Sequence, residues 1–202
     1  LELKLPPAGI VGIVGPNDII LVPSAKMPKA GYVEYGTMYE VYSQEGNFKV
    51  SPLFLLKTSV LDKVAGSVYV QDDFSLISNL QVNMLNIVDD RNKVEHNIAT
   101  GWKNLGMGPG VMQSIWPSYD SYFVYTIGLL DHKTNYHFGM AYDRLDNRKG
   151  LGIFGGEYLF GFGRIMAEWD GYNFNLGMKF EQENFYNYYF SVALFAAQEK
   201  KI

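Results

Sequence analysis

The stretch RIMAEWDGYNFNLGMKF, Arg164 to Phe180, decides the fold. In its second half every even-numbered residue from Tyr172 to Phe180 is apolar, whereas the odd-numbered residues between them are two Asn, one Gly and one Lys. Successive side chains of a strand point to opposite faces, so this alternation predicts a strand with one apolar and one polar face. The first half, up to Trp169, alternates in a similar way and predicts a second strand.

The turn between these two strands predicts how they pair. Asp170-Gly171 favours a two-residue hairpin loop, because both positions tolerate positive φ. Such a loop pairs Trp169 with Tyr172 and puts Glu168 on the opposite, polar face. The apolar residues of both strands then share one face.

A third strand with the same pattern is predicted after Phe180. If residues 182–184 form a three-residue loop, Phe180 pairs with Tyr186 and Leu176 pairs with Phe190. Three consecutive strands would then share one apolar face.

Working outward, period-two alternation recurs along most of the chain. Further strands are predicted from 33 to 41, from 48 after a turn at 44–47, and at 64–71, 76–88, 94–103, 122–130, 135–144 and 151–161. Pro52 predicts a bulge or a locally unpaired position, since proline has no backbone N–H. The count is about eleven, and closed antiparallel barrels in single bacterial chains usually have an even number, so we expect about ten or twelve strands.

The composition excludes several classes of protein. Of 202 residues, 48% are apolar and 15% aromatic, but only 19% are charged. The net charge is -4 and Lys and Arg are not clustered, so nucleic acid is not an expected partner. The absence of cysteine excludes disulfides and thiolate metal sites. No apolar run approaches the roughly 18 residues of a membrane-spanning helix.

The alternation of apolar and polar residues fits two kinds of barrel, one with its apolar face inside and one with its polar face inside. A soluble lipocalin-like barrel turns its apolar face toward a ligand, whereas a membrane barrel turns that face toward lipid. Three features favour the membrane. The polar face carries few charges, Tyr and Trp gather near predicted strand ends, and the strands are about as long as the roughly nine to eleven residues that cross a bilayer.

Three stretches resemble the YjbH-type outer-membrane proteins, which are linked to exopolysaccharide biosynthesis. They are IILVPSAKMPKAGYVEYG at 19–36, SVLDKVAGSVYV at 59–70, and the run at 154–180 with its Gly-Gly-x-Glu-Tyr and Ala-Glu-x-Asp-Gly elements. The resemblance implies a β-barrel in the bacterial outer membrane and supplies no catalytic motif. Besides membrane lipid, it implies other envelope proteins or polysaccharide as partners.

Charged residues of the predicted polar face are the candidate functional residues. We expect the following to face the interior: Glu34, Glu40, His137, Asp143, Glu157, Arg164, Glu168 and Lys179. They could line a passage that selects solutes, or form a static salt-bridge network that fills a narrow barrel, which we favour. We expect the opposite face to meet lipid through these aromatic residues: Trp169, Tyr172, Phe174, Phe180, Tyr186, Tyr188 and Phe190.

The three histidines do not indicate a metal site or an established catalytic motif. His96, His132 and His137 lack the HxxxH or HxH spacing of metal ligands, and we expect neither a metal nor another cofactor. A Ser-His-Asp hydrolase embedded in the membrane would need a serine and a carboxylate beside His96 or His137. Because no GxSxG signature is present, this alternative ranks last.

The sequence therefore predicts an all-β protein, a closed antiparallel up-and-down barrel that crosses the outer membrane. Residues 1–30, rich in proline, are expected to form an irregular plug, tether or extra strand, and residues 31–202 the barrel. The expected function is a structural, envelope-polymer-export or narrow-pore role rather than catalysis. The alternatives are a soluble lipocalin-like carrier of a hydrophobic ligand and the membrane-embedded hydrolase.

Overall fold

The computed structural model describes residues 22–27, 30–44, 47–70, 76–107, 119–143, 149–161, 163–182 and 188–195. The strands within these ranges are β1 Val33–Gln44, β2 Asn47–Leu61, β3 Val64–Val70, β4 Leu76–Asp89, β5 Val94–Met107, β6 Tyr119–Leu129, β7 Thr134–Asp143, β8 Gly150–Phe160, β9 Gly163–Trp169, β10 Phe174–Gln182 and β11 Tyr188–Phe195. They form one antiparallel sheet in which sequence neighbours pair. The predicted all-β, up-and-down arrangement is confirmed, and the described part of the chain contains no helix long and apolar enough to cross a membrane.

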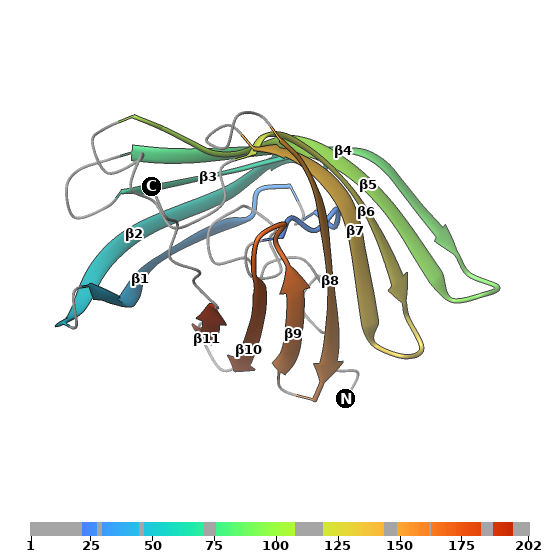
Figure 1. Ribbon diagram of the computed structural model, residues 1–202. Helices are drawn as coiled ribbons and strands as arrows, with labels where there is room; N and C mark the ends of the chain where they lie inside the picture. Colours follow the sequence, from blue (N-terminus) through green and yellow to red (C-terminus); the bar gives the residue numbers. More distant parts are fainter. Residues whose placement is uncertain are drawn as a thin grey trace.

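The sheet curls into an open trough, as Figure 1 shows. Within the described ranges β1 pairs with β2 alone and β11 with β10 alone, so the sheet is not closed and the predicted closed barrel is wrong for these residues. The strand count also differs from the even number that the prediction assumed. Because eleven strands alternate in direction, β1 and β11 run the same way and could join only as a parallel pair, whereas the prediction assumed an even, wholly antiparallel circuit.

The β9–β10 hairpin has a longer loop than the sequence predicts. Trp169 pairs with Phe174 rather than Tyr172. The Asp170 carboxylate explains the difference, because its Oδ1 accepts hydrogen bonds from the backbone N–H groups of Tyr172 at 2.9 Å and Asn173 at 2.7 Å. These bonds stabilise a four-residue loop at 170–173 in place of the two-residue turn.

The β10–β11 pairing is also displaced from the predicted register. Phe180 pairs with Phe190 rather than Tyr186, and Leu176 pairs with Leu194. Residues 183–187, which connect the two strands, lie outside the described ranges. Both hairpin corrections shift the partner by an even number of residues. The side chains therefore stay on the predicted faces, because a shift of two positions preserves the face.

Pro52 lies in a regular part of β2 rather than in a bulge. It pairs with Tyr39 of β1 without a register shift, whereas the pairing of β2 with β3 begins only at Phe54. At Pro52 the described part of β2 therefore pairs with β1 but not with β3, and a proline, which has no backbone N–H, is tolerated at such a position. Register shifts lie elsewhere, between Ser59 and Leu61, Ser78 and Leu80, Asn83 and Leu85, and Tyr119 and Ser121.

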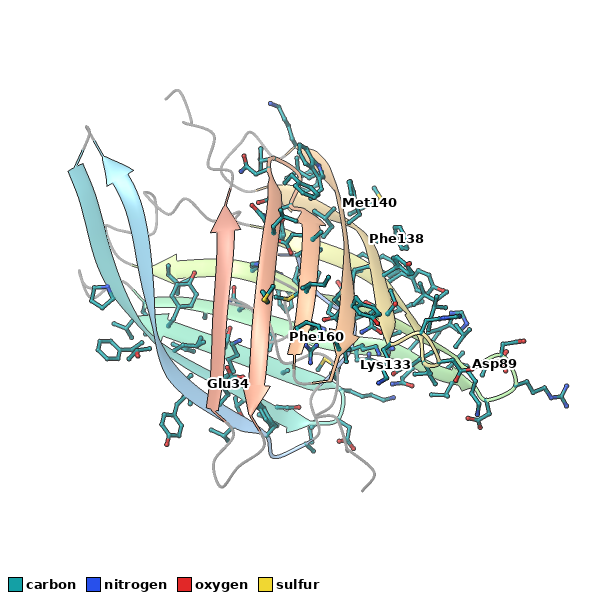
Figure 2. The ribbon with its side chains drawn as sticks, turned by 90° about the horizontal axis from the view of Figure 1, so that it is seen from below. Glu34, Asp89, Lys133, Phe138, Met140 and Phe160 are labelled. Carbon is teal, nitrogen blue, oxygen red and sulfur yellow. The ribbon has the colours of Figure 1, made fainter. Side chains whose placement is uncertain are left out.

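The convex face of the sheet is apolar and exposed. Large apolar side chains alternate along the strands and point away from the trough, as Figure 2 shows for Phe138 and Met140 of β7. The exposed set on the strands comprises Val33, Tyr35, Phe54, Leu56, Val60, Leu61, Val68, Leu76, Leu80, Met84, Leu85, Ile87, Val88, Trp102, Phe123, Tyr136, Phe138, Met140, Tyr142, Phe154, Tyr158, Ile165, Phe174, Leu176 and Met178. Residues 84–88 of β4 are an exception to the alternation, because they are exposed on both faces.

The concave face is buried and mostly polar. Its polar members are Lys57, Ser59, Ser67, Asn79, Gln81, Asn83, Asn97, Lys103, Thr126, Asn135, His137, Glu157, Arg164, Glu168, Asn175 and Lys179. A smaller apolar cluster lies in the trough, formed by Val22 and Ala25, which precede the first strand, together with Tyr69, Ile77, Ala99, Tyr119, Tyr122, Val124, Ala141, Ile153 and Met166 of the sheet. The described residues thus have apolar side chains outside and polar side chains inside, the opposite of a soluble protein, in which charged residues are rarely buried.

Candidate functional site

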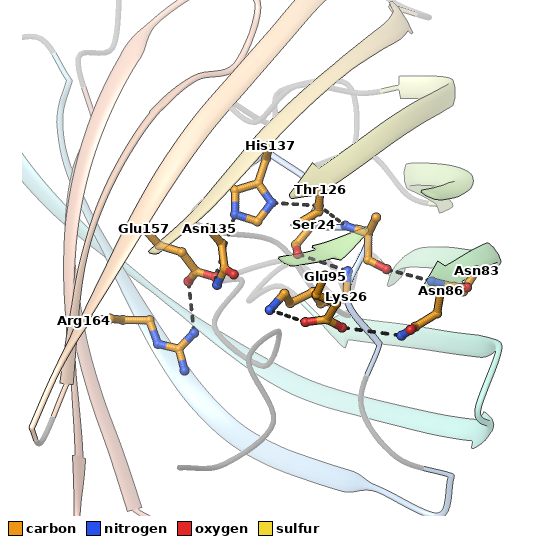
Figure 3. A network of polar contacts seen from close by, with 11 residues as sticks. Ser24, Lys26, Asn83, Asn86, Glu95, Thr126, Asn135, His137, Glu157 and Arg164 are labelled. Carbon is orange, nitrogen blue, oxygen red and sulfur yellow. Dashed lines mark hydrogen bonds and ion pairs between the residues drawn. The ribbon is translucent and has the colours of Figure 1, made fainter. Parts of the chain in front are cut away.

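The most heavily charged part of the trough is a polar network that spans β6 to β9 (Figure 3). Thr126 Oγ1 lies 2.9 Å from His137 Nδ1, and His137 Nε2 lies 3.7 Å from Glu157 Oε1. Arg164 donates from Nη1 to Glu157 Oε2 at 3.0 Å. Asn135 Nδ2 donates to the other carboxylate oxygen at 2.6 Å. Both oxygens of Glu157 therefore have a donor.

Strand register brings these side chains together. Thr126 is the cross-strand partner of His137, and Asn135 is the partner of Glu157. Arg164 pairs with Leu159, so it approaches Glu157 diagonally across the β8–β9 ladder. Because directly opposed and diagonal residues of neighbouring strands lie within reach of one another, an unbroken antiparallel sheet assembles the network from four strands.

Burial makes the pairing within this network essential. His137, Glu157 and Arg164 are all almost inaccessible to solvent. An isolated charge transferred out of water costs several kcal/mol, and a buried charge is tolerated only with a partner and hydrogen bonds. The Glu157–Arg164 pair meets both conditions, so either residue alone would leave an uncompensated charge in the trough.

A second polar cluster lies where β9 meets β10. Asn175 Nδ2 donates to Glu168 Oε1 and to Asp170 Oδ2, each at 3.1 Å. Glu168 and Asn175 are directly paired across the two strands. The second oxygen of Glu168 accepts a hydrogen bond from the backbone N–H of Val22 at 2.9 Å, so this cluster holds an N-terminal residue.

Residues Val22–Met27, which we term the strap, lie in the trough and belong to none of its eleven strands. Thr126 Oγ1 accepts from Ala25 N–H at 2.8 Å, which connects the strap to the β6–β9 network. Gln81 Nε2 donates to the Ser24 carbonyl at 2.7 Å and Asn83 Nδ2 to the Ala25 carbonyl at 2.9 Å. The strap therefore contacts β4 and β6 through polar side chains of the sheet.

An ion pair fixes the other end of the strap. Lys26 Nζ lies 2.8 Å from Glu95 Oε2 of β5, and the lysine is almost fully buried (Figure 3). Glu95 Oε1 in turn accepts from Asn86 Nδ2 of β4 at 3.5 Å. Gly128 leaves room for these side chains, because a Cβ at that position would lie 2.8 Å from Asn135 Oδ1 and 3.0 Å from Lys26 Nζ, so both side-chain ends would have to shift.

Several charged residues predicted to face the interior lie in the trough. His137, Glu157, Arg164, Glu168 and Lys179 are buried on the concave face. Glu34 is only half-buried, 3.8 Å from Lys57 Nζ, and it accepts a hydrogen bond from the Tyr32 hydroxyl at 3.1 Å. The side chains of Glu40 and Asp143 lie outside the described part of the structure.

The aromatic residues predicted to face lipid are described only in part. Phe174 is exposed on the convex face, and Trp169 and Tyr172 are half-buried. The side chains of the remaining four fall outside the described set: Phe180, Tyr186, Tyr188 and Phe190. The convex residues with the largest exposed fractions, Tyr35 at 85% and Met140 at 70%, were not among the predicted site residues.

Sequence reasoning missed the uncharged half of the interior. Gln81, Asn83 and Thr126 hold the strap, but the predicted site was restricted to charged side chains. A signal for Gln81 and Asn83 was present, because Ile77, Asn79, Gln81 and Asn83 share one parity of β4. No local signal indicated the strap contacts, since they join residues far apart in the sequence.

The histidines occupy two different environments. His137 has the Thr126 hydroxyl and the Glu157 carboxylate on its two sides, but all three side chains are buried and the hydroxyl is bonded to the strap. His96 stacks on Tyr125 and lies 2.6 Å from its hydroxyl. Among the described residues, no group of three or more His, Asp or Glu side chains is placed to hold a metal ion.

Comparisons with known proteins returned no match to a family model, a curated protein or a solved structure.

Proposed function

We propose that this chain is a β-sheet protein of the bacterial outer membrane, with its convex face in lipid and its concave face enclosing a polar interior. The observation that carries the proposal is the inverted distribution of side chains. Apolar residues are exposed along the strands, while charged and amide side chains are buried beneath them. Membrane sheets have this arrangement, because lipid replaces water on the outer face.

The free energy of side-chain transfer supports the same orientation. Burying a Val, Leu, Phe or Met side chain is favourable by about 1.5–3 kcal/mol, so a water-exposed face with this many of them would be costly. Contiguous exposed apolar surfaces larger than a few hundred Å² are rare in soluble monomers and mark contact with protein or membrane. Lipid removes that cost without any change in the sheet.

Strand β7 also has the order of residues that a bilayer favours. Tyr136 and Tyr142 lie toward its two ends, and Phe138 and Met140 lie between them on the same face. Tyr is enriched at membrane–water interfaces, with apolar residues in the hydrocarbon. At about 3.3 Å per residue the two tyrosines are roughly 20 Å apart along the strand, which a tilt of about 35–45° reduces to roughly 15 Å along the membrane normal, within the roughly 25 Å apolar band of outer-membrane barrels.

Within the described ranges β1 and β11 have no strand on their outer edges, and the proposal requires protein, from this chain or another, to cover those edges in lipid. Lipid offers no hydrogen-bond partner to the N–H and C=O groups of an open sheet edge. We therefore infer a structural or polymer-export role in the envelope, with membrane lipid and other envelope proteins or polysaccharide as partners. The resemblance to YjbH-type proteins favours the same role, without an enzymatic step.

The test is membrane extraction followed by gel electrophoresis with and without boiling. The wild-type chain should require detergent and migrate differently before and after heating. Leu176→Arg places a charge on the convex face and should impair insertion, since such a charge costs about 2–4 kcal/mol at the bilayer midplane. Asp131→Arg in the exposed β6–β7 turn is the matched control and should insert normally.

Either of two results would overturn the proposal. One is a wild-type chain that is soluble without detergent and migrates identically before and after boiling. The other is insertion of Leu176→Arg as efficiently as Asp131→Arg. In the first case the apolar convex face would need a protein partner instead of lipid.

A further inference from the structure

We propose that the strap, Val22–Met27, is a displaceable stopper, and that its withdrawal opens the polar interior to small hydrated ions. This inference rests on the proposed membrane location and adds a regulated passage to it. The observation behind it is that the strap lies among buried polar side chains and is held by contacts that water can replace.

The contacts of the strap are spread across the trough. Val22 bonds to Glu168 of β9, Ala25 to Thr126 of β6, and Lys26 pairs with Glu95 of β5. Gln81 and Asn83 of β4 donate to two of its carbonyls. A segment anchored on β4, β5, β6 and β9 crosses the interior from one group of strands to another and obstructs it.

These contacts can break without unfolding the sheet. Each involves a side chain of the sheet, whereas the strands are held by the backbone ladder from β1 to β11. Water can hydrogen-bond to the released carbonyls, amides and charges, so the net loss for each contact is small. Val22 and Ala25 of the strap also belong to the apolar cluster of the trough, so withdrawal exposes their side chains, at a cost of about 1.5–3 kcal/mol for a fully buried valine.

Once the strap is withdrawn, water that enters the interior can form hydrogen bonds with the polar groups there. Within the described structure, Oδ1 of Asn97 and Oδ1 of Asn175 are buried without a hydrogen-bond partner. Such atoms are costly in a dry site and are satisfied in a wet one. The charged groups of the β6–β9 network would likewise face water, and a passage lined by both signs of charge admits hydrated ions.

The first experiment reverses the charge that anchors the strap. The full chain is reconstituted in a planar lipid bilayer with KCl on both sides, and current is recorded for wild type and Lys26→Glu. The substitution places two carboxylates together in place of the Lys26–Glu95 pair. We expect the open fraction to rise about tenfold or more, as for a shift in a two-state equilibrium.

Restoring the pair tests the mechanism. Lys26→Glu combined with Glu95→Lys re-forms an ion pair of the opposite polarity and should return the current to within about twofold of wild type. Lys133→Glu makes the same charge change in the exposed β6–β7 turn and should leave the current at the wild-type level. Rescue by the double substitution would assign the rise in current to the contact between positions 26 and 95, and the thiol labelling described next distinguishes opening of the interior from loss of fold.

A second readout reports the interior directly. The sequence contains no cysteine, so Asn97→Cys introduces a single thiol on the buried face. A charged, membrane-impermeant thiol reagent should label it slowly in the otherwise wild-type chain and about tenfold faster with Lys26→Glu. If Lys26→Glu fails to insert, Asn83→Leu with Thr126→Val removes two uncharged strap contacts and is measured in the same way.

The outcomes separate the two proposals. A wild-type chain that does not insert refutes the membrane location. An inserted chain whose current and thiol labelling are the same with and without the strap substitutions refutes the stopper alone. A wild-type current already as large as that of Lys26→Glu refutes it as well, because the strap would not obstruct the interior.

Discussion

On β7 the two faces of the sheet can be compared residue by residue. Phe138 and Met140 are 52% and 70% exposed on the convex face, whereas Asn135 and His137 are 4% and 0% exposed on the concave face. Phe138 and Met140 have no polar atoms that form hydrogen bonds of the kind seen on the other face, whereas Asn135 and His137 belong to the β6–β9 network. Substitutions should therefore cost most on the buried polar face and least on the exposed apolar one.

The largest effect is expected from breaking the buried ion pair. Arg164→Met should lower the free energy of unfolding by about 3–5 kcal/mol, because Glu157 would remain charged and buried without its main partner. The measurement is denaturant unfolding in detergent micelles. Glu157→Leu with Arg164→Met removes both charges and should cost less than the single substitution, so a fully additive double variant would contradict the pairing.

An intermediate effect is expected from adding one methyl group to each face. Gly101 is buried, and a Cβ there would collide with the Leu80 carbonyl and the Tyr122 hydroxyl. Gly101→Ala should therefore destabilise the fold by about 1–3 kcal/mol. Gly152 is exposed, and a Cβ at that position would have nothing within 4 Å, so Gly152→Ala should change stability by less than about 0.5 kcal/mol in the same unfolding assay. Equal effects at the two positions would remove the distinction between the faces.

The smallest effect is expected on the convex face. Phe138→Leu exchanges one apolar side chain for another in a position proposed to face lipid, so it should alter stability by less than about 0.5 kcal/mol. Ile153→Val, in the apolar cluster of the trough, is the matched comparison and should cost about 0.5–1.5 kcal/mol. Unfolding in micelles measures both, and a larger loss at Phe138 would indicate a packed protein contact there.

The sequence predicted the strands closely because their signal is local. The predicted strands at 64–71, 94–103 and 151–161 correspond to β3, β5 and β8 within a few residues. The loops were predicted less well, since the Asp170 carboxylate stabilises a four-residue loop where the dipeptide Asp170-Gly171 indicated two. Even so, Ile165 and Leu176 lie on the same exposed face, as predicted, because the predicted partner of Trp169 was wrong by two residues and an even shift preserves the face.

The charged members of the candidate site were accessible to the same reasoning, but their partners were not. Alternation placed Glu157, Arg164 and Glu168 on one face, and the structure buries all three. The pairing of Glu157 with Arg164 depends on the length of the β8–β9 turn, which alternation does not specify. The contact of Thr126 with His137 depends on the β6–β7 register, and its contact with Ala25 depends on the position of the strap.

The amino-acid sequence by itself determined where the strands lie and which residues share a face, because a period of two is a property of neighbouring residues. The tertiary structure alone decided that the described sheet stays open and that the strap occupies the trough. The physical reason is the distance along the sequence between the residues in contact. Val22 contacts Glu168 across 146 positions and Ala25 contacts Thr126 across 101, so these contacts exist only once the strands have curled around them.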